Sequence, residues 1–120
     1  MIQVWINEDG ENASALLEAT NNLVSSHKSD GLLGFVMFIR GPETKPILEK
    51  LATEKNINSA VVTCLPKGKK DSALQRYRIN PEAKNTILVY KRKIVTANFV
   101  NINAKKSFDK VEKAVAKMLE

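Results

Sequence analysis

Three places in this sequence carry residue types that suit chemistry: one cysteine, one histidine and one charged turn. Cys64 lies in an apolar segment, and His27 ends a stretch of apolar residues at helical spacing. The turn Arg40-Gly41-Pro42-Glu43 separates an apolar run from a second helical pattern. A strand that enters a helix through such a turn is a common ligand site in α/β proteins, because the first amides of a helix are free.

Cys64 has two interpretations. Free cysteine commonly behaves as a small hydrophobic side chain, so a buried strand residue is the simpler one. The alternative is a reactive thiol near the end of its strand, where Lys67, Lys69 and Lys70 would favour the thiolate. A single cysteine excludes an internal disulfide and a zinc site built from several cysteines.

The histidine and the charged turn also have simple interpretations. His27 falls at a predicted helix end, where the helix dipole favours a capping imidazole. No ligand spacing supports a metal site, and we expect no cofactor. Arg40 and Glu43 form a surface pair across a helix start in the simple interpretation. In the other, Arg40 and the helix amides bind a carboxylate or phosphate of a partner, although Glu43 opposes an anion.

The chain is basic, with 19 Lys+Arg against 13 Asp+Glu and a net charge of +6. Its basic clusters, residues 67–70, 91–93 and 105–106, are expected to be solvated surface. Nucleic-acid binding requires such clusters on one face with interleaved aromatic rings. The aromatic residues near them are mostly predicted in the core: Tyr77, Tyr90, Phe99 and Phe108. Trp5, predicted at a sheet edge, is a candidate protein contact.

Size and hydropathy predict one domain over residues 1–120, since 43% hydrophobic residues suffice for one core. No apolar run approaches the roughly 18 residues of a membrane span, and the N-terminus lacks the pattern of a signal peptide. We expect a soluble protein, cytoplasmic or exported if a signal has been removed.

Hydrophobic periodicity predicts strands at residues 2–6, 32–39, 59–65, 86–90 and 94–100. Helices are predicted at residues 13–28, after Pro42 to about residue 55, at 71–77, and at the C-terminus, where Phe108, Val111, Val115 and Met118 share a face. Residues 32–39 are apolar on both faces, so we expect them in the middle of the sheet. The short connection at residues 91–93 requires an antiparallel hairpin.

The resulting order, β-α-β-α-β-α-β-β-α, resembles the thioredoxin fold over essentially the whole chain. Residues 40–52 look like the thioredoxin segment in which Cys-Gly-Pro-Cys opens a helix. Residues 77–79 are similar to the Tyr-x-Ile/Val before the late strands, and residues 85–95 to the Pro-Thr strand with its hairpin. The resemblance implies an α/β, three-layer α/β/α sandwich with a mixed five-stranded sheet.

The departures from thioredoxins concern the chemistry. Under the resemblance, Arg40 and Glu43 stand where both redox cysteines should be, so the dithiol reaction is absent. Asn85 stands before Thr86 where thioredoxins place a cis-proline. The buried acidic residue of redox-active members would fall near Gly34, which has no side chain.

Three functions follow from these observations. The first is a non-catalytic binding or scaffolding module that presents the loops around Arg40, Pro66 and Asn85 to a protein partner. The second is a redox or thiol-reactive protein working through Cys64. The third is a weak binder of nucleic acid or anionic surfaces, driven by charge. We expect a protein partner rather than nucleic acid, and either a monomer or a homodimer.

Overall fold

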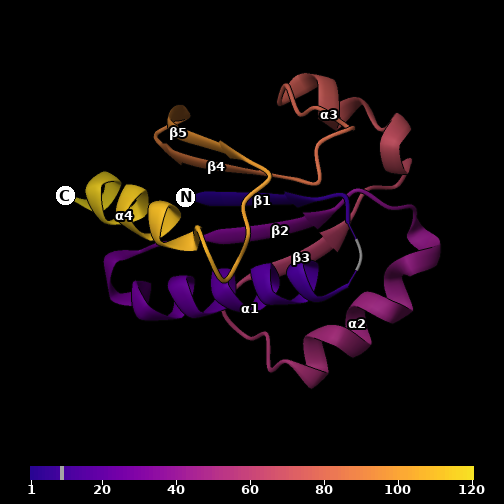
Figure 1. The fold of residues 1–120 in the computed structure, drawn as a ribbon, viewed down its shortest axis with the longest axis horizontal. Helices are drawn as coiled ribbons and strands as arrows, with labels where there is room; N and C mark the ends of the chain where they lie inside the picture. Colours follow the sequence, from indigo (N-terminus) through magenta and orange to yellow (C-terminus); the bar gives the residue numbers. More distant parts are fainter. Residues whose placement is uncertain (9) are drawn as a thin grey trace.

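The computed structural model describes residues 1–8 and 10–120 (Figure 1). Its strands are β1 (Ile2–Ile6), β2 (Gly34–Phe38), β3 (Val61–Cys64), β4 (Asn85–Lys91) and β5 (Ile94–Val100). Its helices are α1 (Glu11–Ser26), α2 (Lys45–Glu54), α3 (Ser72–Arg76) and α4 (Phe108–Leu119). Short 3-10 turns are η1 (Lys28–Asp30), η2 (Pro42–Thr44) and η3 (Gly68–Lys70). The predicted order of strands and helices is confirmed.

The five strands form one mixed sheet in the order β3-β2-β1-β4-β5. β1, β2 and β3 are parallel, and β4 runs antiparallel to both β1 and β5. The central strand is therefore β1, all five residues of which are buried. The expectation that residues 32–39 form the middle of the sheet is wrong by one strand, because β4 pairs with the free edge of β1.

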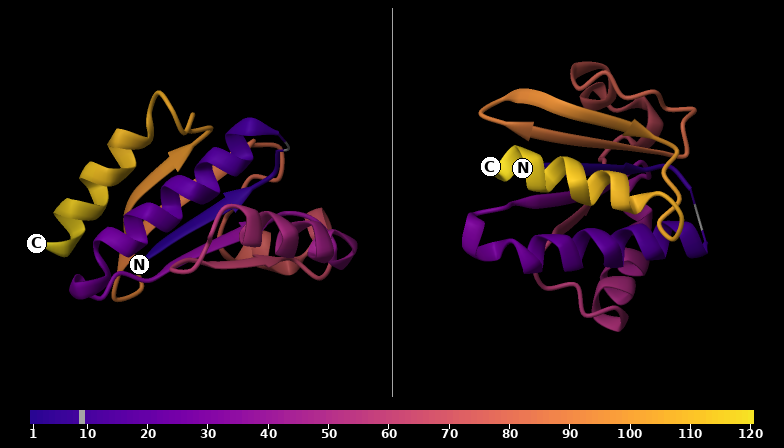
Figure 2. Two further views of the ribbon diagram at one scale, coloured as in Figure 1. Left: turned by 90° about the horizontal axis from the view of Figure 1, so that it is seen from below. Right: turned by 60° about the vertical axis from the view of Figure 1, so that its left-hand side comes forward.

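The two faces of the sheet are covered unequally. The β1-α1-β2 and β2-α2-β3 units step across the sheet in the same direction, so right-handed crossovers place α1 and α2 on the same face. After β5 the chain returns to this face as α4, and Figure 2 shows α1 and α4 on one side of the sheet. Within the described residues, the five-residue α3 packs on the other face through Ala73 and Leu74. The three-layer α/β/α architecture is confirmed, with one thick and one thin helical layer.

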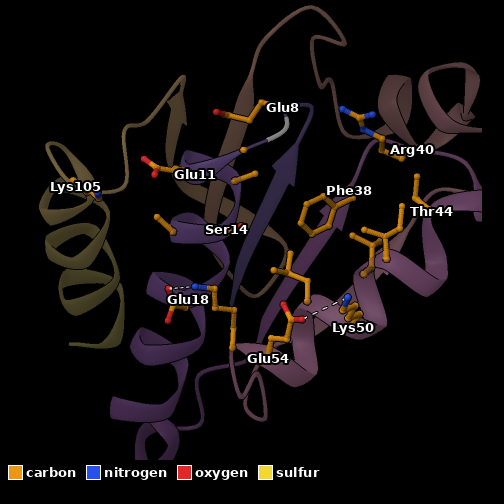
Figure 3. A pocket seen from close by; sticks show the side chains of 17 residues that line it. Glu8, Glu11, Ser14, Glu18, Phe38, Arg40, Thr44, Lys50, Glu54 and Lys105 are labelled. Carbon is orange, nitrogen blue, oxygen red and sulfur yellow. Dashed lines mark ion pairs between the residues drawn. The ribbon is translucent and has the colours of Figure 1, made fainter.

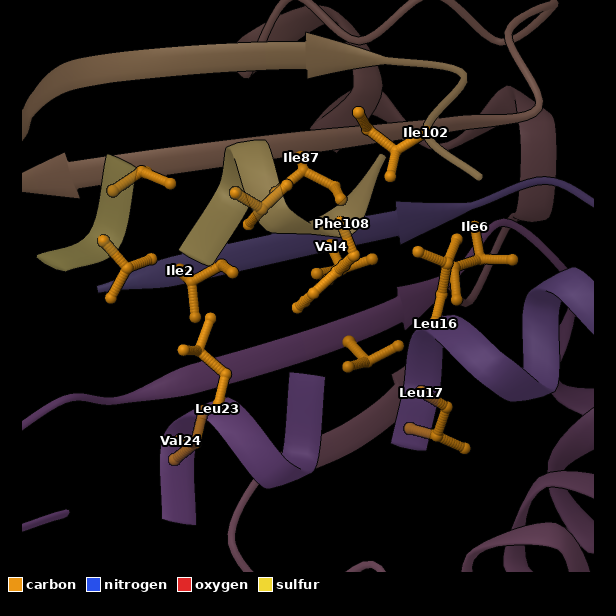
Figure 4. Close-up of a cluster of buried hydrophobic side chains, with 14 of the residues drawn as sticks. Ile2, Val4, Ile6, Leu16, Leu17, Leu23, Val24, Ile87, Ile102 and Phe108 are labelled. Carbon is orange, nitrogen blue, oxygen red and sulfur yellow. The ribbon is translucent and has the colours of Figure 1, made fainter. Parts of the chain in front are cut away.

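The larger core lies between the sheet and α1, α2 and α4 (Figure 4). Its α4 residues are the four that the sequence predicts on one face: Phe108, Val111, Val115 and Met118. α1 packs closely against β2 at Gly34, where an added Cβ would lie 2.3 Å from Cγ2 of Val24. Glycine at this position therefore sets how near the helix approaches the sheet.

The smaller core lies on the α3 face and surrounds Trp5. Trp5 is only 1% exposed, so its prediction as an exposed edge residue is wrong. It lies on the central strand, and α3 covers it through Leu74. Its Nε1 donates to Oε1 of Gln3 over 3.3 Å, which satisfies the buried indole.

Two local predictions are confirmed. β4 and β5 form an antiparallel hairpin, in which Arg92 and Lys93 take positive φ angles of 52° and 69°. This pair of left-handed residues matches the right-handed twist of the strands. His27 is the C-cap residue of α1, and its Nδ1 lies 3.1 Å from a carboxylate oxygen of Asp30.

Candidate functional site

The carboxyl ends of β1, β2 and β3 meet at one edge of the sheet, since the three strands are parallel. Ligands of open α/β sheets bind most often outside this edge. The edge also includes the start of β4, because β4 runs antiparallel to β1. It therefore collects every turn that the sequence marks as a candidate site.

A polar cluster closes the edge at the end of β1. Oε1 of Glu8 accepts a hydrogen bond from Nδ2 of Asn12 (3.1 Å), and Oε2 accepts one from Nδ2 of Asn85 (2.8 Å). We call these three residues the Glu8 cluster. Both oxygens of one carboxylate are thus held by amides from α1 and β4.

The Glu8 cluster also anchors the loop between β5 and α4. The carbonyl oxygen of Ile102 accepts from both Asn12 and Asn85, and its backbone N–H donates to Oδ1 of Asn85 over 2.8 Å. Oδ1 of Asn12 accepts from the N–H of Ala104. Asn85 is 1% exposed and Thr86 is buried, so these side chains hold the fold together and face no partner.

The turn after β2 is built around Gly41. The N–H of Arg40 donates back to the carbonyl of Phe38, and Thr44 donates twice to the carbonyl of Gly41. The carboxylate of Glu43 occupies the space that a Cβ at position 41 would fill. The absence of a side chain at Gly41 is therefore required for this placement of Glu43.

The turn after β3 packs on the turn after β2. Gly68 has a φ of 56°, and a Cβ on it would lie 3.4 Å from the backbone nitrogen of Gly41 and 3.7 Å from the carbonyl carbon of Arg40. Arg40 and Gly41 also line a shallow hollow of about 590 Å³ with Pro66, Lys67 and Lys69, among others. The loops around Arg40 and Pro66 therefore form one surface.

Asn85 lies apart from that surface. Strand β1 stands between β2 and β4, so the end of β1 separates the turn at residues 40–43 from Asn85. The side chain that meets Asn85 is Glu8, which follows β1. No sequence motif points to Glu8 or assigns Asn12 to this cluster. Asn12 and Asn85 each carry a short amide side chain next to an apolar run, and this pattern is the signal that could have pointed to the cluster.

A groove of about 780 Å³ runs between α1 and α2 from this edge (Figure 3). Phe38 and Leu48, both nearly buried, form part of its lining, and Ile47 on α2 is 67% exposed beside it. Glu18 and Lys55 also line the groove and form an ion pair, with their charged atoms 3.7 Å apart. The groove therefore combines apolar side chains in its floor with charged side chains along its walls.

Cys64 lies on β3, which is an edge strand, and faces α2. Cys64 packs against the larger core but is only partly buried, so the expectation of a buried strand residue holds only in part. It lines a pocket of about 350 Å³ with Lys45, Leu48 and Pro66, among others. Lys67, Lys69 and Lys70, expected beside it, are not among the residues of this pocket.

The described residues contain neither a cluster of metal-ligating side chains nor a membrane-spanning helix. Among residues 1–8 and 10–120, no group of three or more His, Cys, Asp or Glu side chains is placed to hold a metal ion. Within the same residues, no helix has the length and apolar character needed to cross a membrane.

Comparison with known proteins decides the fold. No family model matches the chain, and no curated protein matches it. Among solved structures, a Chlorobium tepidum protein assigned as the thiol:disulfide interchange protein DsbE aligns with a TM-score of 0.75, covering 99% of this chain and 79% of its own. The sequence identity is 13%. The fold is thioredoxin-like.

The sequence of this thioredoxin-like chain has one cysteine, whereas dithiol exchange uses an attacking and a resolving thiol. At the sheet edge, the described residues present charged groups, amides and an apolar groove.

Proposed function

We propose that this chain is a non-catalytic thioredoxin-like module that binds a protein partner. The observation that carries the proposal is the groove between α1 and α2, with Phe38 in its floor and the exposed Ile47 beside it. The side chain of Ile47 is 67% exposed, so a partner that covers it would bury apolar surface and thereby stabilise the complex.

The turn at the degenerate active-site position supplies the polar rim of this surface. Arg40-Gly41-Pro42-Glu43 replaces the two thiols of a redox motif with charged residues, and Arg40 lines both the groove and the hollow next to Pro66. Asn85 and Thr86, at the cis-proline-equivalent position, are buried and lie outside this surface. A charged rim around an apolar centre is the common anatomy of a protein interface.

A photo-crosslinking residue at position 47 tests the proposal. We expect it to capture a defined partner, whose affinity for the purified chain then falls at least about tenfold in Ile47→Ser and in Arg40→Ala. Ile94→Ser is the matched control, because Ile94 is 69% exposed but lies on the hairpin. Equal losses in Ile47→Ser and Ile94→Ser, or capture that is equally efficient from position 94, would contradict the proposed surface.

The alternative is a thiol-reactive protein that works through Cys64, and the partial exposure of this residue favours it. Measuring the alkylation rate of Cys64 against pH in folded and unfolded protein separates the two. A folded thiol that reacts faster than the unfolded one near neutral pH supports the alternative. A folded thiol that reacts no faster supports the binding module.

A further inference from the structure

The thin helical layer leaves part of the sheet uncovered on the α3 face. α3 covers Trp5, Ile39, Leu65 and Leu88, and neighbouring positions on the same face are exposed or partly exposed. We call six of these side chains, at successive positions of four strands, the open face. Its members are Phe35, Val61, Thr63, Tyr90, Val95 and Asn98. None of them is charged.

Aromatic rings from three elements lie on this open face or at its border. Tyr77, the C-cap residue of α3, is 44% exposed and lies over Trp5 with ring centroids 5.4 Å apart. Tyr90 on β4 is partly exposed, and its hydroxyl accepts a hydrogen bond from Gln3. Phe35 on β2 is partly exposed and pairs in register with Gln3.

The two tyrosines lie close enough to influence each other. Burial raises the pKa of Tyr90, the hydrogen bond from Gln3 lowers it, and the nearby Tyr77 raises it further. Tyr77, Trp5, Gln3 and Tyr90 thus form a continuous row, with Phe35 beside it. Phe99 and Phe108, by contrast, pack against the larger core as the sequence predicts.

The positive charge of the chain is concentrated in the segment that contains β3, α3, β4 and β5. Residues 61–101 contain nine Lys or Arg and two Asp or Glu. The rest of the chain contains ten and eleven. The whole excess of positive charge therefore belongs to residues 61–101.

In this segment, cationic residues are sequence neighbours of the two tyrosines. Arg76 and Arg78 flank Tyr77, and the hairpin Lys91-Arg92-Lys93 follows Tyr90; all five side chains are exposed. One of the two acidic residues, Asp71, accepts hydrogen bonds from the backbone N–H groups of Ala73 and Lys67. Little negative charge opposes an anion at this face.

We propose that the open face binds single-stranded nucleic acid. Bases stack on Tyr77 and on the exposed parts of Tyr90 and Phe35, while Arg76, Arg78 and the hairpin cations contact phosphates. Aromatic platforms interleaved with cations are the arrangement that binds single strands with little sequence preference. The bases of a duplex are stacked within it and cannot lie on exposed rings, so single strands are favoured over duplex.

Fluorescence anisotropy with labelled dT20 and rU20, and with a duplex of the same length, tests the proposal. We expect saturable binding of the single strands, weaker binding of the duplex, and a linear fall of log K with log salt concentration. The ratio of the two single-strand affinities tells whether the natural ligand is DNA or RNA. Absence of saturable binding to both single strands at about 50 mM salt overturns the proposal.

Two charge-matched triple variants locate the site. Changing Lys91, Arg92 and Lys93 to Gln should reduce the slope of log K against log salt by up to about 2, since each phosphate contact to a single strand contributes about 0.7. Changing Lys110, Lys113 and Lys117 to Gln removes the same charge from exposed positions of α4 on the opposite face. Equal effects of both triples would reduce the binding to unspecific charge attraction and overturn the proposal.

A ring variant tests the stacking part. Tyr77→Leu keeps an apolar cover over Trp5 but removes the aromatic face, and it should weaken binding roughly 5- to 100-fold with an unchanged salt slope. Tyr77→Phe keeps the ring and should bind like the wild type, which also controls for damage to the fold. Wild-type affinity in Tyr77→Leu overturns the stacking role. Binding of phosphatidylserine vesicles or polyglutamate that outcompetes both single strands assigns the face to another anionic partner and overturns the proposal.

Discussion

At the residue scale, hydrogen bonds hold the carboxylate of Glu8 in place at the edge of the sheet where β1 ends. Each of its oxygens accepts from an amide, one from Asn12 and one from Asn85. The cluster ties β1, α1, β4 and the loop before α4 together through four side-chain hydrogen bonds to Ile102 and Ala104. We infer that its first role is structural.

Glu8→Gln should lower the free energy of unfolding by roughly 1–2 kcal/mol. The new NH₂ group must face an amide NH₂ of Asn12 or Asn85, so one hydrogen bond is lost. Urea unfolding followed by circular dichroism measures the change. Glu11→Gln, at the exposed first residue of α1, is the control. Its free energy of unfolding should stay within about 0.5 kcal/mol of the wild type. Similar values for the two variants would show that the cluster contributes nothing specific.

At the element scale, the distance between α1 and β2 depends on Gly34. A Cβ on Gly34 would lie 2.3 Å from Val24 and 3.3 Å from Ile2, so the surrounding side chains leave no space for a methyl group. A buried acidic side chain, which redox-active thioredoxins carry near this position under the sequence resemblance, would not fit here without a shift of α1.

Gly34→Ala should therefore destabilise the protein by roughly 1–3 kcal/mol through overpacking. Adding Val24→Ala removes the opposing methyl groups, so the double variant should be more stable than the sum of the two single changes by at least about 0.5 kcal/mol. Thermal or urea unfolding of the four proteins in this cycle measures the coupling. Strict additivity would mean that the two residues do not limit the approach of helix and strand.

The start of α3 depends on Asp71, its N-cap residue. The backbone N–H of Ala73 donates to this carboxylate and lowers its pKa from the usual 3.8, with smaller contributions from Lys67 and Arg76. A lowered pKa in the folded state stabilises the protein above the pKa of the unfolded chain. This stabilisation disappears as the pH falls through the folded value.

Asp71→Asn keeps an oxygen that can cap the helix, whereas Asp71→Ala does not. At pH 7 we expect both variants to melt below the wild type, with Ala lower than Asn. As the pH falls through the folded-state pKa of Asp71, the difference between the wild type and Asn should shrink, because the aspartate becomes protonated. A difference that persists unchanged at acidic pH would exclude the charge of Asp71 as its cause.

At the scale of the whole molecule, the two cores share one sheet, and the central strand β1 contributes to both. That residues 1–120 form a single domain stays a prediction, and we propose that they unfold in one cooperative transition. Fluorescence of Trp5 reports on the smaller core, while far-ultraviolet circular dichroism reports mainly on α1 and α4. Coincident urea transitions by the two signals are expected. Two separated midpoints would show that the α3 side unfolds independently.

The limits of sequence-based prediction follow from particular residues. The strand and helix order was predictable because apolar periodicity and turn residues are local signals. The central position of β1, the burial of Trp5 and the partial exposure of Cys64 were not. These depend on which strand pairs with β4 and which strand remains at the edge, and strand pairing joins residues far apart in the chain.

The candidate site shows the same division. The turn at Arg40-Gly41-Pro42-Glu43 was visible in the sequence, whereas the contact of Gly68 with it and the Glu8 cluster required the tertiary structure. The sequence by itself determined the element order, the excess of cations and the single thiol, since these are properties of composition and local pattern. Only the tertiary structure decided the thin layer on the α3 face and the row of Tyr77, Trp5 and Tyr90 there. The physical reason is that the directions of successive crossovers, and not any local residue pattern, decide which side of the sheet each helix covers.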